Sequence, residues 1–156
     1  MKKYFILYLL FIVHVSCRYE ESTSTTTFIT NNSSHSIEII PYYQGMISTI
    51  DIKDIAPNST LSVLSNNTRG KSAGYSYPIY LIAVDSVYVS YDNLNTVVYY
   101  KENSLSTNLK AITYDSSRSI YNEANYIRKI LIESKRSISN EYTFTFTEQD
   151  YLDANQ

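Results

Sequence analysis

The chain has 156 residues, with 13 Lys or Arg against 15 Asp or Glu, and its aromatic residues are mostly tyrosine: 17 Tyr, 5 Phe and no Trp. A hydrophobic content of 44% with 18% charged residues is typical of one globular domain, and it excludes general disorder, a collagen repeat and a multi-span membrane protein. The near-neutral charge argues against nucleic acid as a partner, because nucleic-acid binders concentrate Lys and Arg to displace counterions.

Residues 1–16 predict a secretion signal. Lys2 and Lys3 form a basic start, an apolar run covers residues 4–13, and the small Ser16 stands directly before Cys17. The apolar run is too short for a membrane-spanning helix, which needs ~20 residues. The chain is therefore expected to be exported rather than held by a permanent transmembrane segment.

A signal that ends directly before a lone cysteine resembles the lipobox of bacterial lipoproteins, although His14 stands where that motif usually has an aliphatic residue. The resemblance implies that Cys17 becomes the first residue of the mature chain and carries a lipid anchor. Ordinary cleavage that leaves a thiol is the alternative. Acyl chains contribute ~0.8 kcal/mol per buried methylene, so two or three would hold the protein on a membrane.

The residues after Cys17 predict a tether over residues 17–27. Arg18 to Glu21 resembles the export signal that sends lipoproteins of Bacteroidota to the outer face of the outer membrane, and a solvated spacer is the alternative reading. Residues 22–27 are only Ser and Thr, which is typical of a flexible linker. The expected location is the cell envelope, as an outer-membrane lipoprotein exposed at the surface.

From residue 28 onward, short stretches of alternating apolar and polar residues predict half-buried strands. They cover residues 37–39, 50–53, 61–63, 87–91 and 142–147. Continuous apolar runs over residues 79–84 and 97–100 predict strands that are covered on both faces. Turn residues separate the pieces roughly every ten to fifteen residues, which predicts an all-β domain over residues 28–156. We expect a single antiparallel β-sandwich, immunoglobulin-like or a similar Greek key, with at most one short helix.

Two segments are less regular. Residues 119–133 fit either a helix that begins at Ser119 or one or two helical turns up to Asn125 followed by a hairpin, and we favour the second interpretation. The acidic end, residues 148–153, predicts a turn that closes the domain.

Several stretches resemble the small lipoproteins of Bacteroidota. They are the lipobox at Cys17, residues 29–33, residues 121–126 and, above all, the Tyr-Thr-Phe-Thr-Phe-Thr-Glu-Gln-Asp-Tyr sequence of residues 142–151. The resemblance implies a compact, mainly β domain attached to the envelope, and it supplies no catalytic residues.

Side chains for metal, cofactor or catalytic chemistry are scarce. His35 is the only histidine after the signal, and its polar turn has no nucleophile-elbow glycines, so we predict a surface histidine, no metal and no cofactor. Glu148, Asp150 and Asp153 lie close together but match no calcium-loop spacing. We therefore predict that the protein is not an enzyme; a glycan-processing hydrolase that uses a carboxylate pair is the alternative.

The best candidate for recognition is a long, polar loop predicted over residues 65–77. Arg69, Lys71, Tyr75 and Tyr77 are its candidate binding residues, because exposed tyrosines stack on sugars and anchor protein interfaces. Core or cross-strand packing competes with this role of the tyrosines, and for the tyrosines as a group we favour packing. The predicted function is a lipid-anchored, non-catalytic binding or interaction module whose partner is another envelope protein or a glycan.

Two further signals are short. Asp85-Ser86-Val87 resembles the O-glycosylation acceptor of exported Bacteroidota proteins, and this prediction requires an exposed Ser86. Basic pairs at residues 128–129 and 135–136 flank the expected hairpin. These basic residues could attract anionic lipid headgroups or polysaccharide. The alternative is that they only protect an edge strand from aggregation.

Overall fold

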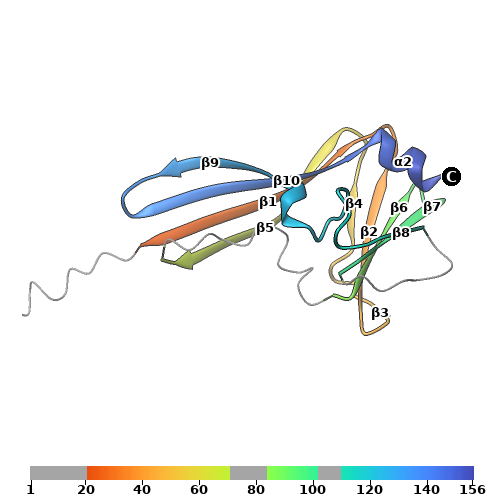
Figure 1. The fold of residues 1–156 in the computed structure, drawn as a ribbon, viewed down its shortest axis with the longest axis horizontal. Coiled ribbons are helices and arrows are strands. Elements are labelled where there is room, and N and C mark those ends of the chain that lie inside the picture. The colour runs from red at the N-terminus through yellow and green to blue at the C-terminus, as the bar shows by residue number, and fades with distance from the viewer. Residues whose placement is uncertain (1–20, 71–83, 102–109) are drawn as a thin grey trace, which may run out of the picture.

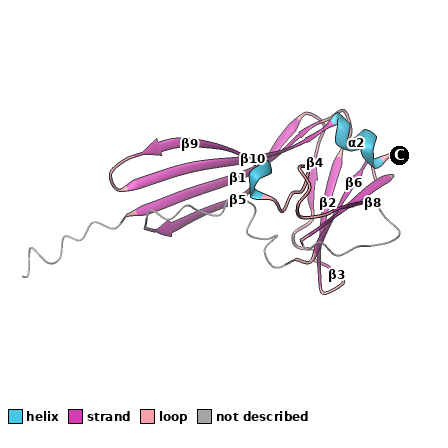
Figure 2. Ribbon diagram, viewed as in Figure 1, coloured by secondary structure: helices cyan, strands magenta, loops and turns pink. Residues whose placement is uncertain are grey.

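The computed structural model describes residues 21–70, 84–101 and 110–156, which form two β-sheets and one short α-helix (Figures 1 and 2). The four-stranded sheet has the order β5 (Ser59–Arg69), β1 (Ser22–Asn32), β10 (Ser137–Thr147) and β9 (Ile127–Glu133). The six-stranded sheet has the order β3 (Met46–Ile47), β2 (Ile37–Tyr43), β6 (Ser86–Tyr91), β7 (Asn95–Tyr100) and β8 (Lys110–Ile112), with β4 (Lys53–Ile55) also paired to β2. Helix α2 (Glu148–Ala154) follows β10, and a 3₁₀ turn, η2 (Glu123–Asn125), precedes β9.

The predicted all-β sandwich with one short helix is confirmed. Most neighbouring strands are antiparallel, but β1 pairs with β10 and β7 pairs with β8 in the parallel sense. Between the sheets lies a core of aliphatic and aromatic side chains. Its fully buried members are Ile29, Ile37, Ile39, Val87, Val89, Tyr91, Tyr99, Ile120, Tyr121, Phe144 and Phe146.

Strand β1 begins at Ser22, so the prediction of a flexible tether over residues 17–27 is wrong for its second half. Thr23, Thr25 and Thr27 are buried, and β1 lies between β5 and β10 along its whole length. Threonine is β-branched and suits a pleated strand, and two long partners supply hydrogen bonds on both sides. A composition that is typical of a linker therefore forms the centre of a sheet.

The four-stranded sheet is longer than the sandwich. In Figure 1 the strands β1, β5, β9 and β10 extend to one side, beyond the six-stranded sheet. We call this part the projecting half; it comprises residues 22–27 of β1, 64–69 of β5, 137–142 of β10 and all of β9. The remainder of β1, β5 and β10 is the sandwich half.

The inner face of the projecting half carries a row of buried polar side chains beside the core residue Tyr142. Thr25 pairs directly with Asn140, and both side chains are almost fully buried. Among the described residues, the hydroxyls of Thr25 and Thr27 and the amide nitrogen of Asn140 have no hydrogen-bond partner. A buried polar group without a partner costs about 1–3 kcal/mol, so this row lowers the stability of the fold.

Of the two predictions for the C-terminal part of the chain, the one for residues 119–133 is confirmed and the one for residues 148–153 is wrong. The favoured helical turn and hairpin are present as η2 and the β9–β10 pair. The acidic end forms helix α2 rather than a turn, because the Asp150 carboxylate accepts hydrogen bonds from the backbone and hydroxyl of Thr147 and caps the first helical turn.

Two expected strands differ from the structure. The stretch of residues 50–53 is mostly a turn: the side chain of Ile50 is 89% exposed, and strand β4 begins only at Lys53. The alternation of apolar and polar residues over residues 50–53 therefore does not correspond to a half-buried strand. The run of residues 79–84 lies outside the described residues apart from Val84, which is buried.

Candidate interaction surface

Most of the predicted binding residues cannot be placed. Cys17, Lys71, Tyr75 and Tyr77 lie outside the described residues. Arg69 is the exposed last residue of β5. The prediction of a loop beginning at residue 65 is wrong, because residues 65–69 continue β5 and pair with β1.

Ser86 does not meet the condition for O-glycosylation. It is 8% exposed and pairs with Tyr42 of β2 on one side and with Tyr100 of β7 on the other. A glycosyltransferase needs an accessible hydroxyl, and a central strand between two neighbours does not present one. The predicted modification of Ser86 is therefore withdrawn.

The tyrosines of the six-stranded sheet pack as core and cross-strand residues. Tyr91 and Tyr99 are buried in the core, and burial raises the pKa of both phenols above the ordinary value. Tyr42 and Tyr88 pack against each other across β2 and β6, with ring centroids 4.3 Å apart. Packing, the favoured interpretation of the tyrosines, therefore accounts for these four residues.

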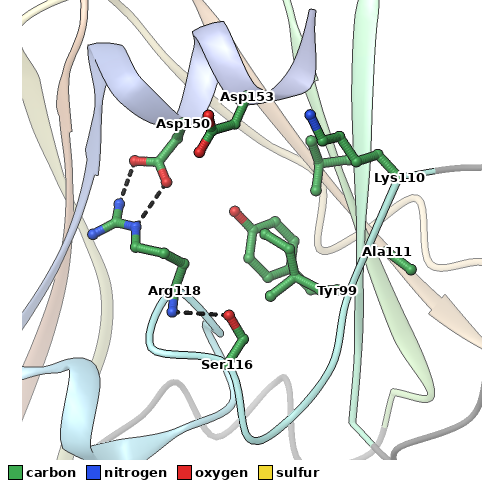
Figure 3. A pocket seen from close by; sticks show the side chains of 9 residues that line it. Tyr99, Lys110, Ala111, Ser116, Arg118, Asp150 and Asp153 are labelled. Atoms are coloured by element: carbon green, nitrogen blue, oxygen red, sulfur yellow. Dashed lines mark hydrogen bonds and ion pairs between the residues drawn. The ribbon is translucent and has the colours of Figure 1, made fainter. Parts of the chain in front are cut away.

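A cavity of about 310 Å³ lies between α2, the β7–β8 edge and the segment that precedes η2 (Figure 3). It is lined by Val97, Tyr99, Lys110, Ala111, Ile112, Ser116, Arg118, Asp150 and Asp153. In Figure 3 the hydroxyl of Tyr99 points towards α2, where Asp150 and Asp153 lie.

The charged groups of this cavity hold the helix in place. Arg118 donates from Nε to one oxygen of Asp150 at 2.8 Å, from Nη2 to the other oxygen, and from Nη2 to the carbonyl of Thr145. Burial lowers the pKa of Arg118, but the hydrogen bonds and charge of Asp150 raise it by more. Asp150 also accepts hydrogen bonds from the backbone N–H and the hydroxyl of Thr147, so each of its oxygens is bound by at least one structural donor.

Asp150 is therefore engaged in structural contacts. The carboxylate pair of the alternative hydrolase would need a carboxylate that is available to a substrate or a water molecule. The buried Asp150 instead serves as the joint between α2, β10 and the loop that carries Arg118.

His35 is the centre of a second charged cluster. Its Nδ1 lies 2.6 Å from Asp92 and its Nε2 lies 3.4 Å from Glu148, while its ring stacks on Tyr151 with centroids 3.4 Å apart. The backbone and hydroxyl of Ser36 also donate to Asp92. The cluster joins the β1–β2 turn, the β6–β7 turn and the start of α2, and no local sequence pattern indicates this convergence.

The hydrogen bonds of this cluster stabilise the ionised carboxylates. The hydrogen bond with His35 lowers the pKa of Asp92, and the backbone N–H of Ser34 lowers the pKa of Glu148. The nearby hydroxyl of Ser34 also donates to Glu148 and not to the imidazole. Both ring nitrogens face carboxylates, so the arrangement suits a structural clamp better than a serine nucleophile with its base.

Strand β9 presents the most unusual surface of the described chain. All seven residues of this strand are exposed. Four of them are large and apolar, and their exposed fractions are 72% for Ile127, 47% for Ile130, 48% for Leu131 and 58% for Ile132. We call these four residues, with the outer backbone of β9, the β9 edge surface.

No described strand pairs with the outer side of β9, which is the last strand of the four-stranded sheet. Figure 1 shows it on the projecting half, away from the six-stranded sheet. An open edge offers unpaired N–H and C=O groups to another strand, and native proteins usually protect it with charges, short length or bulges.

The two cations of β9 contact its paired neighbour, β10. Arg128 donates from Nε and Nη2 to the side-chain oxygen of Asn140 and lies over the ring of Tyr142, 5.9 Å from its centroid. Lys129 lies 3.9 Å from Glu141, and its side chain remains 71% exposed. A register shift in the β9–β10 pair leaves Leu131 without a partner on β10, and such a bulge is one device that protects a sheet edge.

The opposite edge of the same sheet is different. Strand β5 has only polar residues at its exposed positions, and its apolar Leu61 and Val63 pack against the core. Of the two edges, only β9 combines unpaired backbone with exposed aliphatic side chains, which is the combination that strand-adding protein interfaces use.

Searches for similar proteins add no further constraint. The chain matched no protein-family model, no curated protein and no solved structure. Among residues 21–70, 84–101 and 110–156, no group of acidic, histidine or cysteine side chains could hold a metal ion, and no helix is long and apolar enough to cross a membrane.

Proposed function

We propose that this protein is a lipid-anchored module of the bacterial cell envelope that binds another polypeptide by adding a strand to β9. The exposed β9 edge surface carries the proposal. In strand addition, backbone hydrogen bonds supply affinity and the side chains of alternate residues supply specificity. The envelope location rests on residues 1–17, whose signal and lone cysteine resemble those of a lipoprotein.

The apolar side chains of β9 support the proposal that this edge is a binding site. Ile130, Leu131 and Ile132 are consecutive, so both faces of the edge carry aliphatic groups. Burying one such side chain contributes about 1.5–3 kcal/mol to the free energy of binding. Burying three neighbouring side chains therefore contributes more than a single exposed apolar residue can. Single exposed apolar residues are ordinary in soluble proteins, whereas a continuous strip on an open edge is typical of an interaction site or an aggregation hazard.

Photo-crosslinking in intact cells tests the interaction. A benzoylphenylalanine in place of Leu131 should give a crosslinked adduct on illumination. The same residue in place of Leu94 is the matched control, because Leu94 is 83% exposed but lies in the β6–β7 turn. Adducts from position 131 alone support the proposal. Equal adducts from both positions, or none from position 131, contradict it.

The anchor has a separate test. Mass spectrometry of the mature chain should find Cys17 as the first residue, with its amino group acylated and its sulfur bearing diacylglycerol. The Cys17→Ser variant should leave the membrane fraction. A mature chain that begins elsewhere, or an unmodified thiol at Cys17, would remove the envelope attachment without affecting the β9 prediction.

A further inference from the structure

The charges of β9 are arranged with opposite signs at its two ends. Arg128 and Lys129 lie near the start of the strand and Glu133 is its last residue, with the three aliphatic residues 130–132 between them. A strand of this composition is complementary to itself when two copies run in opposite directions, because each cationic end then meets an acidic end.

We propose that the β9 edge surface pairs with β9 of a second copy of this chain, in the antiparallel orientation. This inference rests on the proposed function and names its partner. Antiparallel pairing buries residues 130–132 of each copy against those of the other and brings Lys129 and Glu133 of different copies together at both ends. Parallel pairing would place like charges beside each other, which is destabilising.

Lys129 is suited to this contact because its present ion pair is weak. Its side chain is 71% exposed and its ammonium lies 3.9 Å from Glu141, at the limit of an ion pair. Exposed pairs of this kind contribute about 0–1 kcal/mol, so Lys129 can turn to a carboxylate of the second copy at little cost.

The proposed pairing of β9 with itself also limits the assembly to two copies. Pairing β9 with itself uses the same surface on both chains, and a two-fold axis closes the contact. Pairing β9 with the β5 edge of another copy would instead produce an open chain of molecules. The exposed positions of β5 are polar and offer no apolar strip to match residues 130–132.

The test uses the full chain with two different affinity tags, co-expressed and purified in detergent. Each tag should recover the other copy, and the sedimentation mass should correspond to two chains. Ile130→Glu and Ile132→Glu should each weaken self-association at least about tenfold, since truncating a central contact of an interface commonly has that effect. Leu94→Glu is the control and should leave the dissociation constant unchanged.

A charge exchange tests the orientation. Lys129→Glu and Glu133→Lys should each weaken pairing, and the double variant should restore it, because the opposite charges again meet in antiparallel strands. Circular dichroism and the unfolding midpoint confirm that each variant is folded. A double variant no better than the single ones overturns the antiparallel arrangement.

The outcomes separate the two proposals. A purified chain that is monomeric at every concentration tested overturns self-pairing. If position 131 then gives adducts in cells that contain a different polypeptide, the proposed function stands with another partner. If position 131 gives no adduct in cells and the purified chain is monomeric, both proposals fail.

Discussion

The two halves of the four-stranded sheet share their strands but not their chemistry. In the sandwich half, the inner face of β1 and β10 carries Ile29, Phe144 and Phe146, which pack against the second sheet. In the projecting half, the same face carries Thr25, Thr27 and Asn140, and both hydroxyls and the Asn140 amide nitrogen lack partners among the described residues. The β1–β10 ladder is continuous across both halves. Backbone pairing thus extends over the whole length of the sheet, whereas the apolar core that stabilises it packs mainly against the sandwich half.

The largest expected difference between the halves comes from the aromatic core. Phe146→Ala should lower the free energy of unfolding by about 3–5 kcal/mol, because a fully buried ring leaves a cavity. The comparison is Ile138→Ala on the same strand, whose side chain is only partly buried in the projecting half. Urea unfolding measures both. Equal losses would show that the two halves are equally well packed.

The polar row of the projecting half should give an effect of opposite sign. Thr25→Val and Thr27→Val should each raise the free energy of unfolding by about 1 kcal/mol, because a buried hydroxyl without a partner is replaced by a methyl group. Thr26→Val is the control, since Thr26 lies on the other face of β1. A loss of stability in the Thr25 and Thr27 variants would show that these hydroxyls have partners in solution.

The smallest effect concerns pH and the cluster around His35, which lies outside the projecting half. The pKa values of Asp92 and Glu148 are lowered from 3.8 and 4.5, so their stabilising effect is full above about pH 4.5 and is lost as the pH falls through the lowered folded-state values. The unfolding midpoint should therefore decrease on acidification below pH 4.5. Asp92→Asn should flatten this decrease, whereas Asn in place of the exposed Asp54 of β4 should not.

The sequence predicted the elements in which side-chain pattern and burial agree. Alternation over residues 142–147 identified β10, and the continuous apolar run of residues 97–100 identified β7 as covered on both faces. Helix α2 was predicted as a turn, although the sequence contains a signal for the start of a helix. Thr147 and Asp150 have the spacing of a capping box.

Other features depend on partners that are distant in the sequence. Residues 22–27 have the composition of a linker, and only pairing with β5 and β10 makes them a strand. The clamp at His35 needs two turns and a helix to converge, which no local pattern encodes. The basic pair of residues 128–129 was recognised, but its contacts with β10 depend on Asn140 and Glu141, which lie about ten residues further along the chain.

The parallel pairing of β1 with β10 has a consequence for how the chain folds. Ser22 and Ser137 are far apart in the sequence but neighbours in the sheet, so its centre cannot close until β10 has been synthesised. Contacts between such remote segments make folding slow. During synthesis, β1 therefore stays unpaired on the side that β10 later covers.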